Sequence, residues 1–268
     1  MDGLLAEIGR RLADRWLSAL VLPGVLFVAA AVCGGWLGHP HALDTALLED
    51  RTGGLGRRLD GRPAAAVLAV IGALLAATAA GLAVQGIAAG VRRARVARRP
   101  ARWVARRRRR AEAALAARGR TVPARYLPAR ATSIGDRFRL VDQRLDAQYG
   151  LAVSLAWPRL WLLLPDTATA VLGEAATRYR ASAETTAWGV LYLLLGTLWW
   201  PAALVGLLTA AVGHTRARFT AAALADLVES AVDVHQRPLA DTLGVPLPHG
   251  RITPAEGARI NDILNKRA

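Results

Sequence analysis

Long runs of apolar residues, separated by strongly charged segments, dominate the pattern of hydrophobic and polar positions along the chain. Residues 16–38 contain no charged side chain, and the polar members of residues 63–91 are only Thr78 and Gln85. As an α-helix, the 23 residues of the first run extend about 34 Å, enough to cross a hydrocarbon core of about 30 Å. The pattern therefore predicts two full transmembrane helices, at 16–38 and 63–91.

A third apolar run, residues 186–213, allows two interpretations. As one helix its 28 residues extend about 42 Å, which corresponds to a single tilted crossing. Alternatively, Trp199, Trp200 and Pro201 divide the run into two halves of about 20 Å that enter and leave the membrane on the same side. Arginines precede and follow the run, and positive charge at both ends favours two cytoplasmic ends. We expect a membrane hairpin, with a third span as the alternative.

Charge asymmetry predicts the sidedness. Every charged residue from Arg92 to Arg110 is an arginine, whereas residues 39–62 contain both arginines and acidic residues. Cytoplasmic loops of membrane proteins are enriched in positive residues, so we expect 92–185 in the cytoplasm and 39–62 outside. The composition agrees with membrane insertion, because a hydrophobic fraction of 53% combined with a net charge of +15 is unusual for a soluble protein.

The arginine tract predicts contact with anionic lipid headgroups, where each arginine contributes about 1 kcal/mol. The expected headgroup contacts are Arg92, Arg93, Arg106, Arg107, Arg108, Arg109 and Arg110. Tryptophan is enriched at membrane–water interfaces, and the expected interfacial anchors are Trp16, Trp36, Trp157, Trp161, Trp199 and Trp200. A docking arm for an acidic protein is the alternative. Nucleic-acid binding is disfavoured, because no known recognition module accompanies the tract.

The segment 131–185 reads as a helical cytoplasmic module. Ser133 is the expected N-cap of an amphipathic helix that ends at Gly150. Its apolar face comprises Ile134, Phe138, Val141, Leu145 and Tyr149. The apolar stretch 151–165 is too short to cross a bilayer, so it forms either the centre of this module or a segment on the membrane interface. A further helix then starts at Asp166 or Thr167 and runs towards Arg180.

The C-terminal part, 214–268, also has helical periodicity. Its acidic positions Asp226, Glu229 and Asp233 form either a solvated face or partners for the arginines of the 133–149 helix. The last helix starts with a predicted capping box, Thr253 to Glu256, and presents Ile260, Ile263 and Leu264 on one face. No stretch alternates with the period of a strand, so the chain is expected to be all-α.

The expected architecture is an all-α integral membrane protein with two full transmembrane helices, a short membrane hairpin or third span, and a helical cytoplasmic module. Its expected organisation is an N-terminal cytoplasmic amphipathic segment (1–15), transmembrane helix 1 (16–38), an external loop (39–62), transmembrane helix 2 (63–91), an arginine-rich cytoplasmic segment and linker (92–130), the cytoplasmic helical module (131–185), the membrane hairpin or third span (186–213) and C-terminal cytoplasmic helices (214–268). Both termini are expected in the cytoplasm.

Motifs for catalysis and cofactor binding are absent from the sequence. No phosphate-binding loop, HExxH or GxSxG motif occurs, and the only cysteine, Cys33, has no disulfide partner within the chain. His39 and His41 are interpreted as solvated loop residues. We therefore expect no enzyme activity, cofactor or metal. The one polar cluster that a membrane-interface enzyme could use comprises Asp136, Arg137, Asp142, Arg144 and Arg159.

The apolar runs contain small-residue pairs that permit close helix approach. Gly34 with Gly38, and Gly86 with Gly90, each match GxxxG. We expect these pairs to serve packing within the chain, with a homo-oligomer face as the alternative. No Asp, Glu, Lys, Arg or His lies inside any run, and proton-coupled transporters and charge-selective pores need such groups.

Residues 134–166, IGDRFRLVDQRLDAQYGLAVSLAWPRLWLLLPD, resemble a signature of uncharacterised multi-spanning membrane proteins common in actinobacteria. Those proteins have an acid-containing amphipathic helix, then Tyr-Gly, then Trp-Pro-Arg-Leu-Trp. The tail ADLVESAVDVHQRPLADTLGVPLP is similar to their C-terminal part, so the resemblance covers roughly residues 130–268. It implies a membrane location and no particular activity.

Three functions are consistent with these patterns. The first is a non-catalytic interaction or effector component that recruits a soluble partner to the cytoplasmic membrane or acts on the membrane itself. The second is an oligomeric channel or transporter built from the Gly- and Ala-rich spans. The third is a membrane-interface enzyme that uses the polar cluster around Asp136.

Overall fold

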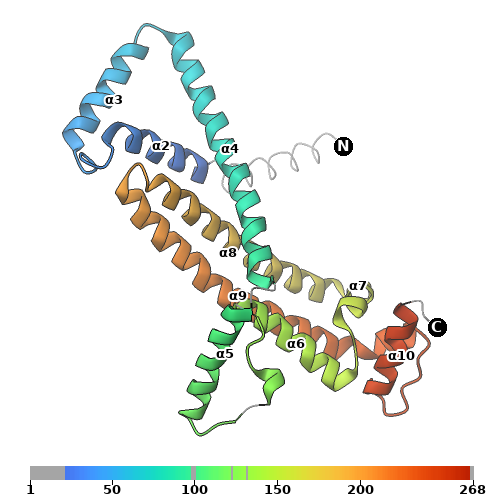
Figure 1. Cartoon of the computed structure of the whole chain (residues 1–268). Helices are drawn as coiled ribbons and strands as arrows, with labels where there is room; N and C mark the ends of the chain where they lie inside the picture. The colour runs from blue at the N-terminus through green and yellow to red at the C-terminus, as the bar shows by residue number, and fades with distance from the viewer. Residues whose placement is uncertain (1–21, 98–100, 122, 131, 266–268) are drawn as a thin grey trace, which may run out of the picture. The chain divides into compact units, whose positions relative to one another are not determined.

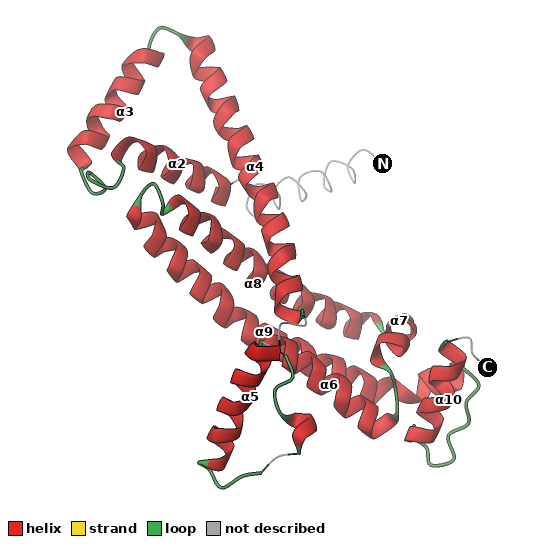
Figure 2. Ribbon diagram, viewed as in Figure 1, coloured by secondary structure: helices red, strands yellow, loops and turns green. Residues whose placement is uncertain are grey.

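The structure is a computed structural model that describes residues 22–97, 101–121, 123–130 and 132–265. Every regular element among these residues is a helix, so the all-α prediction is confirmed (Figures 1 and 2). The helices are α2 (Leu22–Leu37), α3 (Thr45–Leu59), α4 (Pro63–Val96), α5 (Ala101–Ala116), the 3-10 turn η2 (Ala124–Tyr126), α6 (Ser133–Tyr149), α7 (Val153–Leu163), α8 (Asp166–Leu195), α9 (Trp200–Thr242) and α10 (Pro254–Leu264).

The chain divides into two compact units. Unit 1 takes in the chain up to Val91 together with Ala183–His214, and unit 2 is Arg92–Ser182 with Thr215–Ala268. Helices α4, α8 and α9 each continue across the division without a break. The divisions therefore fall within helices, and α8 runs well past Arg180 to Leu195.

In unit 1, α8 and α9 form a helical hairpin, because the chain reverses between Leu195 and Trp200. Glycines allow the two helices to approach closely. A Cβ atom on Gly206 would lie 2.5 Å from the backbone nitrogen of Leu193, and one on Gly189 would lie 2.5 Å from that of Ala210. The apolar run 186–213 is thus two antiparallel helical arms and not one continuous helix.

One helix of the described residues, α4, is long and apolar enough to cross a membrane. Its 34 residues extend about 51 Å, and the apolar part ends at Val91. The apolar helix α2 has 16 described residues, which is fewer than a helix needs to cross a membrane. The segment 1–15, Trp16 and the first residues of the expected span 16–38 lie outside the described residues.

Two segments that were expected to be irregular contain helices. Residues 39–62 include α3, whose N-cap Asp44 accepts a hydrogen bond from the Leu47 amide at 2.9 Å. Three glycines and mixed charges obscure its helical pattern in the sequence, but the cap and the arginines of its last turn favour a helix. Residues 92–130 include α5, because alanine and arginine are both strong helix formers.

Unit 2 has its main core between α6, α7, α9 and α10. The best-buried large side chains of this core are Leu145, Leu151, Leu160, Leu239, Ile252 and Ile260. Ala156 and Leu160 of α7 are buried in it, whereas Leu162 is 82% exposed. The stretch 151–165 therefore contributes one face to the core and leaves another open.

Local helix signals in unit 2 are largely as expected. Gly150 ends α6 with φ of 64°, and Thr253 with Glu256 forms the predicted capping box of α10. The N-cap of α6 is Thr132 and not Ser133, since the Thr132 side chain accepts from the Gly135 amide at 3.0 Å. On α10, Ile260 is buried but Ile263 is 38% exposed, so the predicted apolar face is narrower than three residues.

The close approach of α8 and α9 generates a stability prediction. Gly206→Leu places a side chain where the Leu193 backbone lies, and we expect it to lower the unfolding midpoint of the detergent-solubilised protein by the equivalent of about 1–3 kcal/mol or more. Gly72→Leu on α4 is the matched control, because a Cβ atom there meets nothing within 4 Å. Equal midpoints for the two variants in thermal unfolding would contradict the described packing.

Candidate functional site

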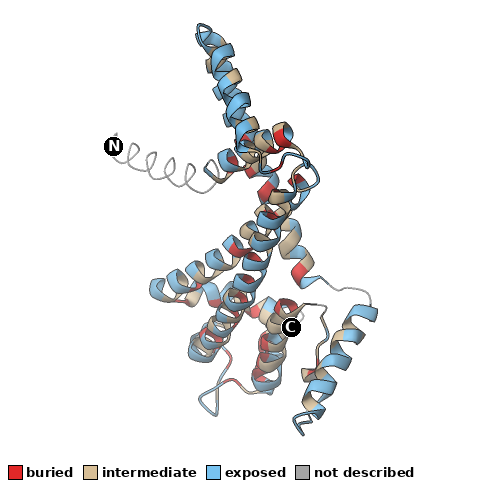
Figure 3. Cartoon of the chain, turned by 90° about the vertical axis from the view of Figure 1, so that its left-hand side faces the viewer, coloured by how far each residue is buried: buried red, intermediate tan, exposed pale blue. Residues whose placement is uncertain are grey.

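The most distinctive surface of the molecule is the apolar surface of unit 1, which consists of the exposed large hydrophobic side chains on α2, α4, α8 and α9. On α2 and α4 these are Leu22, Val25, Leu26, Val32, Val67, Leu68, Val70, Ile71, Leu74, Leu75 and Leu82; on α8 and α9 they are Leu193, Leu194, Leu204, Val205, Leu207, Leu208 and Val212. Most residues of α4 are exposed, and Figure 3 colours long stretches of helix in the chain as exposed. Soluble monomers seldom expose contiguous apolar patches beyond a few hundred Å².

Arginines lie next to the apolar part of each of the three helices that continue from one unit into the other. The arginine collar comprises Arg92, Arg93 and Arg95 on α4, Arg178 and Arg180 on α8, and Arg216 and Arg218 on α9. In unit 1, Val91 packs in a cluster with Ala183 and Ala187, so the apolar parts of α4 and α8 end side by side. The change from apolar to basic residues thus occurs at matching positions on these two neighbouring helices.

One member of the collar points inward. Arg95 is only 6% exposed and donates a hydrogen bond to the Ser182 hydroxyl at 3.5 Å. Burial lowers the pKa of Arg95, and the nearby Tyr179 opposes this shift. The backbone carbonyl of Arg95 accepts a hydrogen bond from the Thr132 hydroxyl. Arg95 therefore ties the end of α4 to α8 and to the start of α6 within unit 2.

Asp136 on α6 is the centre of a buried polar cluster, which we call the Asp136 clasp. One carboxylate oxygen accepts hydrogen bonds from the backbone amides of Ala129 and Arg130, at 3.0 and 2.9 Å, and from Arg139 at 3.2 Å. The other oxygen pairs with Arg107 of α5. The carboxylate side chain is 7% exposed. The clasp therefore fixes α5, and the loop that connects α5 to α6, against α6.

The clasp assigns different roles to neighbouring arginines of the tract. Arg107 turns inward to Asp136 and to the backbone carbonyl of Arg130, at 2.7 Å from the latter. Arg108 pairs with Glu112 on the surface of α5 at 3.0 Å. Within the described part of the chain, Arg106, Arg109 and Arg110 have no acidic partner. Of the expected headgroup contacts, Arg107 is thus already engaged inside unit 2.

A second set of ion pairs joins α6 to α9. Arg137 pairs with Asp226, and Arg144 pairs with Glu229 at 2.7 Å. Asp226 and Glu229 are therefore partners of α6 arginines, as the pairing alternative predicted, whereas Asp233 accepts a hydrogen bond from Tyr149. Arg159 instead donates to the backbone carbonyl of Leu155 at 3.0 Å. The polar cluster that an enzyme could have used is divided among these separate contacts.

Tyr149 continues the α6–α9 contact at the end of α6. Its hydroxyl donates to the Asp233 carboxylate at 2.8 Å and lies within 2.8 Å of the Gln148 amide nitrogen. Burial, together with Asp233, raises the pKa of the Tyr149 hydroxyl to about 12. Asp142, which lines a cavity of about 330 Å³ with Phe138 and Val228, has its pKa raised by burial and by Asp146.

The tryptophans expected at the interface occupy several environments. Trp199 stands against Gly34 of α2, and its indole nitrogen donates to the Ala42 carbonyl at 2.9 Å. Trp200 is 41% exposed at the start of α9. Trp157 and Trp161 contact each other on α7, with ring centroids 5.9 Å apart, and Trp161 is 38% exposed. Trp36 is half-buried and lines a hollow with residues of α3.

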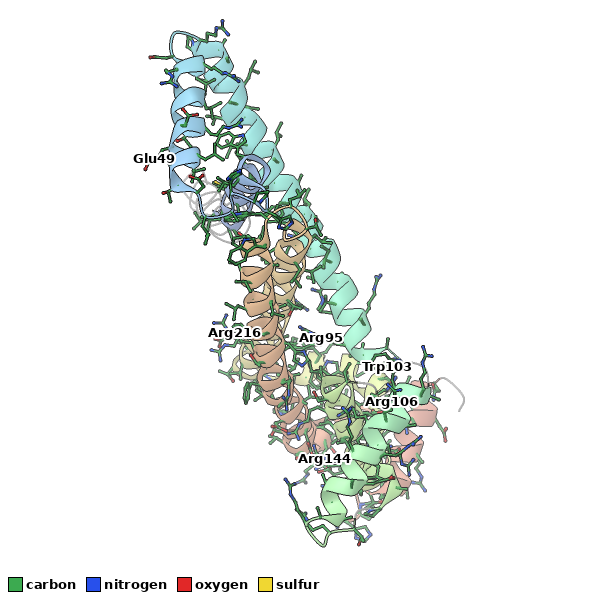
Figure 4. The ribbon with its side chains drawn as sticks, turned by 60° about the vertical axis from the view of Figure 1, so that its left-hand side comes forward. Glu49, Arg95, Trp103, Arg106, Arg144 and Arg216 are labelled. Atoms are coloured by element: carbon green, nitrogen blue, oxygen red, sulfur yellow. The ribbon has the colours of Figure 1, made fainter. Side chains whose placement is uncertain are left out.

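Sequence reasoning missed Trp103, which is 54% exposed at the start of α5. Figure 4 shows Trp103 and Arg106 on α5 near the end that follows α4. The signal was present in the sequence as a tryptophan beside the arginine run. It was overlooked because the tract was interpreted as a linker and not as a helix with distinct faces.

The histidines and the cysteine offer no metal site among the described residues. His41 lies 3.8 Å from Asp44, and His39 contacts the Thr197 carbonyl at 2.9 Å. No group of three metal-ligating side chains occurs in the part of the chain that the structure describes. Cys33 is a half-buried free thiol on α2.

Comparison with known proteins gives no assignment, since no family model, curated protein or solved structure matches the chain.

The Asp136 clasp generates a prediction about the placement of α5. Asp136→Asn leaves Arg107 and Arg139 without their buried counter-charge, and removing one partner of a buried pair costs about 3–5 kcal/mol. We expect a lowered unfolding midpoint and faster proteolysis of α5. Glu112→Gln, which breaks the exposed pair with Arg108, should cost less than about 0.5 kcal/mol. A clasp variant as stable as this control would show that the cluster does not hold α5.

The Tyr149 pKa generates a prediction about alkaline pH. The folded-state pKa, about 12, lies above the ordinary value of 10.0. The unfolded state therefore loses this proton first, and the free energy of unfolding falls as the pH rises from about 10 to about 12. Tyr149→Phe should remove this part of the pH dependence in denaturant titrations. An unchanged slope in the variant would assign the dependence to another group.

Proposed function

We propose that the protein is a multi-pass cytoplasmic-membrane protein whose unit 1 lies in the bilayer and whose unit 2 lies in the cytoplasm. In this proposal 16–38 and 63–91 are full spans, 186–213 is a membrane hairpin, and α3 is external. Both termini are cytoplasmic. Unit 2 serves as a membrane-anchored interaction module, without catalysis, that recruits a soluble partner to the membrane or acts on the membrane itself.

The apolar surface of unit 1 is the single observation that carries this proposal. Burial of one large aliphatic side chain stabilises a protein by about 1.5–3 kcal/mol, and many such side chains on α4 and α9 have no protein cover among the described residues. A hydrocarbon environment removes them from water without further protein contacts. The backbone of a helical unit already satisfies its own hydrogen bonds, as a bilayer requires.

The arginine collar supports the proposed sidedness. Its residues follow the apolar parts of α4, α8 and α9, while α3 carries arginines together with Glu49, Asp50 and the capping Asp44. Positive charge concentrated beyond one end of the apolar segments favours the cytoplasm for that end. Arg92 and Arg93 of the collar, together with Arg106, Arg109 and Arg110 of α5, remain proposed contacts to anionic headgroups.

The interaction role is supported by how unit 2 uses its polar groups. Asp136, Arg137 and Arg144 are engaged in ion pairs that join helices, so they stabilise the module's shape. A rigid helical module held next to a membrane is suited to presenting a surface to a soluble partner.

A homo-oligomeric channel is the second candidate, favoured by one feature of α4. A Cβ atom on Gly86 or Gly90 would meet nothing within 4 Å among the described residues, so this small-residue face is open to a second copy. Reconstitution in liposomes discriminates the two functions. Protein-dependent ion flux that is lost in Gly86→Leu would favour the channel, and a silent bilayer would favour the interaction module.

The proposed topology predicts a labelling pattern. In a Cys33→Ala background, a single cysteine at Gly54 on α3 should react with a membrane-impermeant maleimide in intact cells, because a side chain there is unobstructed. A cysteine at Arg110 on α5 should react only in inside-out vesicles. Reaction of position 110 from outside would reverse the sidedness, and reaction of both positions in intact cells would refute the spanning arrangement.

A further inference from the structure

We propose that the first turns of α5 form an interfacial anchor in which Trp103 enters the headgroup layer of an anionic bilayer and Arg102 and Arg106 bind the lipid phosphates. This inference rests on the proposed function, because it requires unit 1 to place the chain at a membrane.

The site is a small basic hollow on the outside of α5. Arg102, Trp103 and Arg106 line a cavity of about 170 Å³. Trp103 is 54% exposed although it is the largest apolar side chain of the helix. A tryptophan combines a large apolar ring with an N–H donor, which suits the boundary between water and acyl chains. A guanidinium group binds phosphate oxygens in a bidentate arrangement.

The Asp136 clasp determines which face of α5 stays available. Arg107 and Val104 are half-buried on the side of α5 that faces α6, and Arg107 is held there by Asp136. Trp103, Arg106 and Arg110 are exposed and recur at spacings of three and four along one side of α5. Arg107, four residues after Trp103, borders this side and turns towards Asp136. Glu112, the only acidic residue of α5, forms its ion pair with Arg108 on a different face of the helix. The face with Trp103 therefore carries positive charge without a neighbouring acid on the same helix.

The place of α5 in the chain favours a lipid surface over other occupants. Trp103 follows Val91, the last residue of the apolar part of α4, by only twelve residues, and the first five of them continue that helix. These five helical residues extend α4 by about 7.5 Å beyond Val91. Trp103 is thus tethered close to the end of a proposed span, on the side where the cytoplasmic leaflet carries anionic lipid.

Site-directed spin labelling of the full chain in lipid nanodiscs tests the anchor. In a Cys33→Ala background, a nitroxide at Arg106 retains Trp103 and Arg102, a nitroxide at Glu112 reports another face of α5, and a nitroxide at Leu74 reports α4. The measured quantity is the ratio of collision rates with oxygen, which partitions into lipid, and with a water-soluble nickel chelate. Discs of phosphatidylcholine are compared with discs that contain phosphatidylglycerol.

We expect the label at 106 to be lipid-facing in phosphatidylglycerol discs and the label at 112 to face water. The oxygen-to-nickel ratio at 106 should fall severalfold in phosphatidylcholine discs, in Trp103→Ala and in Arg102→Gln. Arg237→Gln removes one positive charge from α9, which contributes no residue to the hollow at Trp103, and it should leave the ratio unchanged.

Two outcomes overturn the proposal and remain distinguishable. If the label at 106 faces water in anionic discs while the label at 74 faces lipid, the anchor is refuted. Trp103 would then be available to contact a soluble partner. If the label at 106 faces lipid equally in both kinds of disc and in Trp103→Ala, the anchor does not depend on the residues assigned to it. Water-facing labels at both 74 and 106 contradict the proposed function itself.

Discussion

The apolar surface of unit 1 is the constraint on which the rest of the structure depends. Helices α8 and α9 approach closely at glycines, and Gly24 of α2 lies against the backbone of Ala77 on α4. Close packing of this kind leaves large side chains such as Leu75 and Leu208 pointing outward. Unit 1 thus has small residues between its helices and large apolar residues on its surface, which is the reverse of the arrangement in a soluble helical bundle. It is the arrangement favoured where lipid, and not water, surrounds the helices.

Unit 2 combines an apolar core with ion pairs that join its helices. Asp136 holds α5 through Arg107, and Asp226 and Glu229 hold α9 to α6. The same cluster orients the arginine tract, since an arginine that turns inward to a carboxylate forces its neighbours onto other faces. A tract that is uniform in sequence thereby acquires distinct faces, and the face with Trp103 is free to meet a charged surface.

Periodicity and end signals predicted much of the fold. The faces of α6, the stop at Gly150 and the capping box at Thr253 depend on local interactions, and a sequence reports these directly. The pairing of the α9 acids with α6 was open in the sequence, because it requires two helices distant in the chain to meet. Helix α3 was missed because its glycines weaken the helical pattern, although its N-cap Asp44 and the arginines of its last turn favour a helix. Trp103 was missed for a related reason, since its exposure depends on which side of α5 the Asp136 clasp holds.

We propose that lipid covers the apolar surface of unit 1. Electron cryo-microscopy of the full chain in a nanodisc, enlarged by an antibody fragment bound to unit 2, observes this directly. We expect disc density around residues 63–91 and 186–213, with α3 on one side of the disc and unit 2 on the other. Density that surrounds unit 2 instead, or α3 and unit 2 on the same side of the disc, would contradict it.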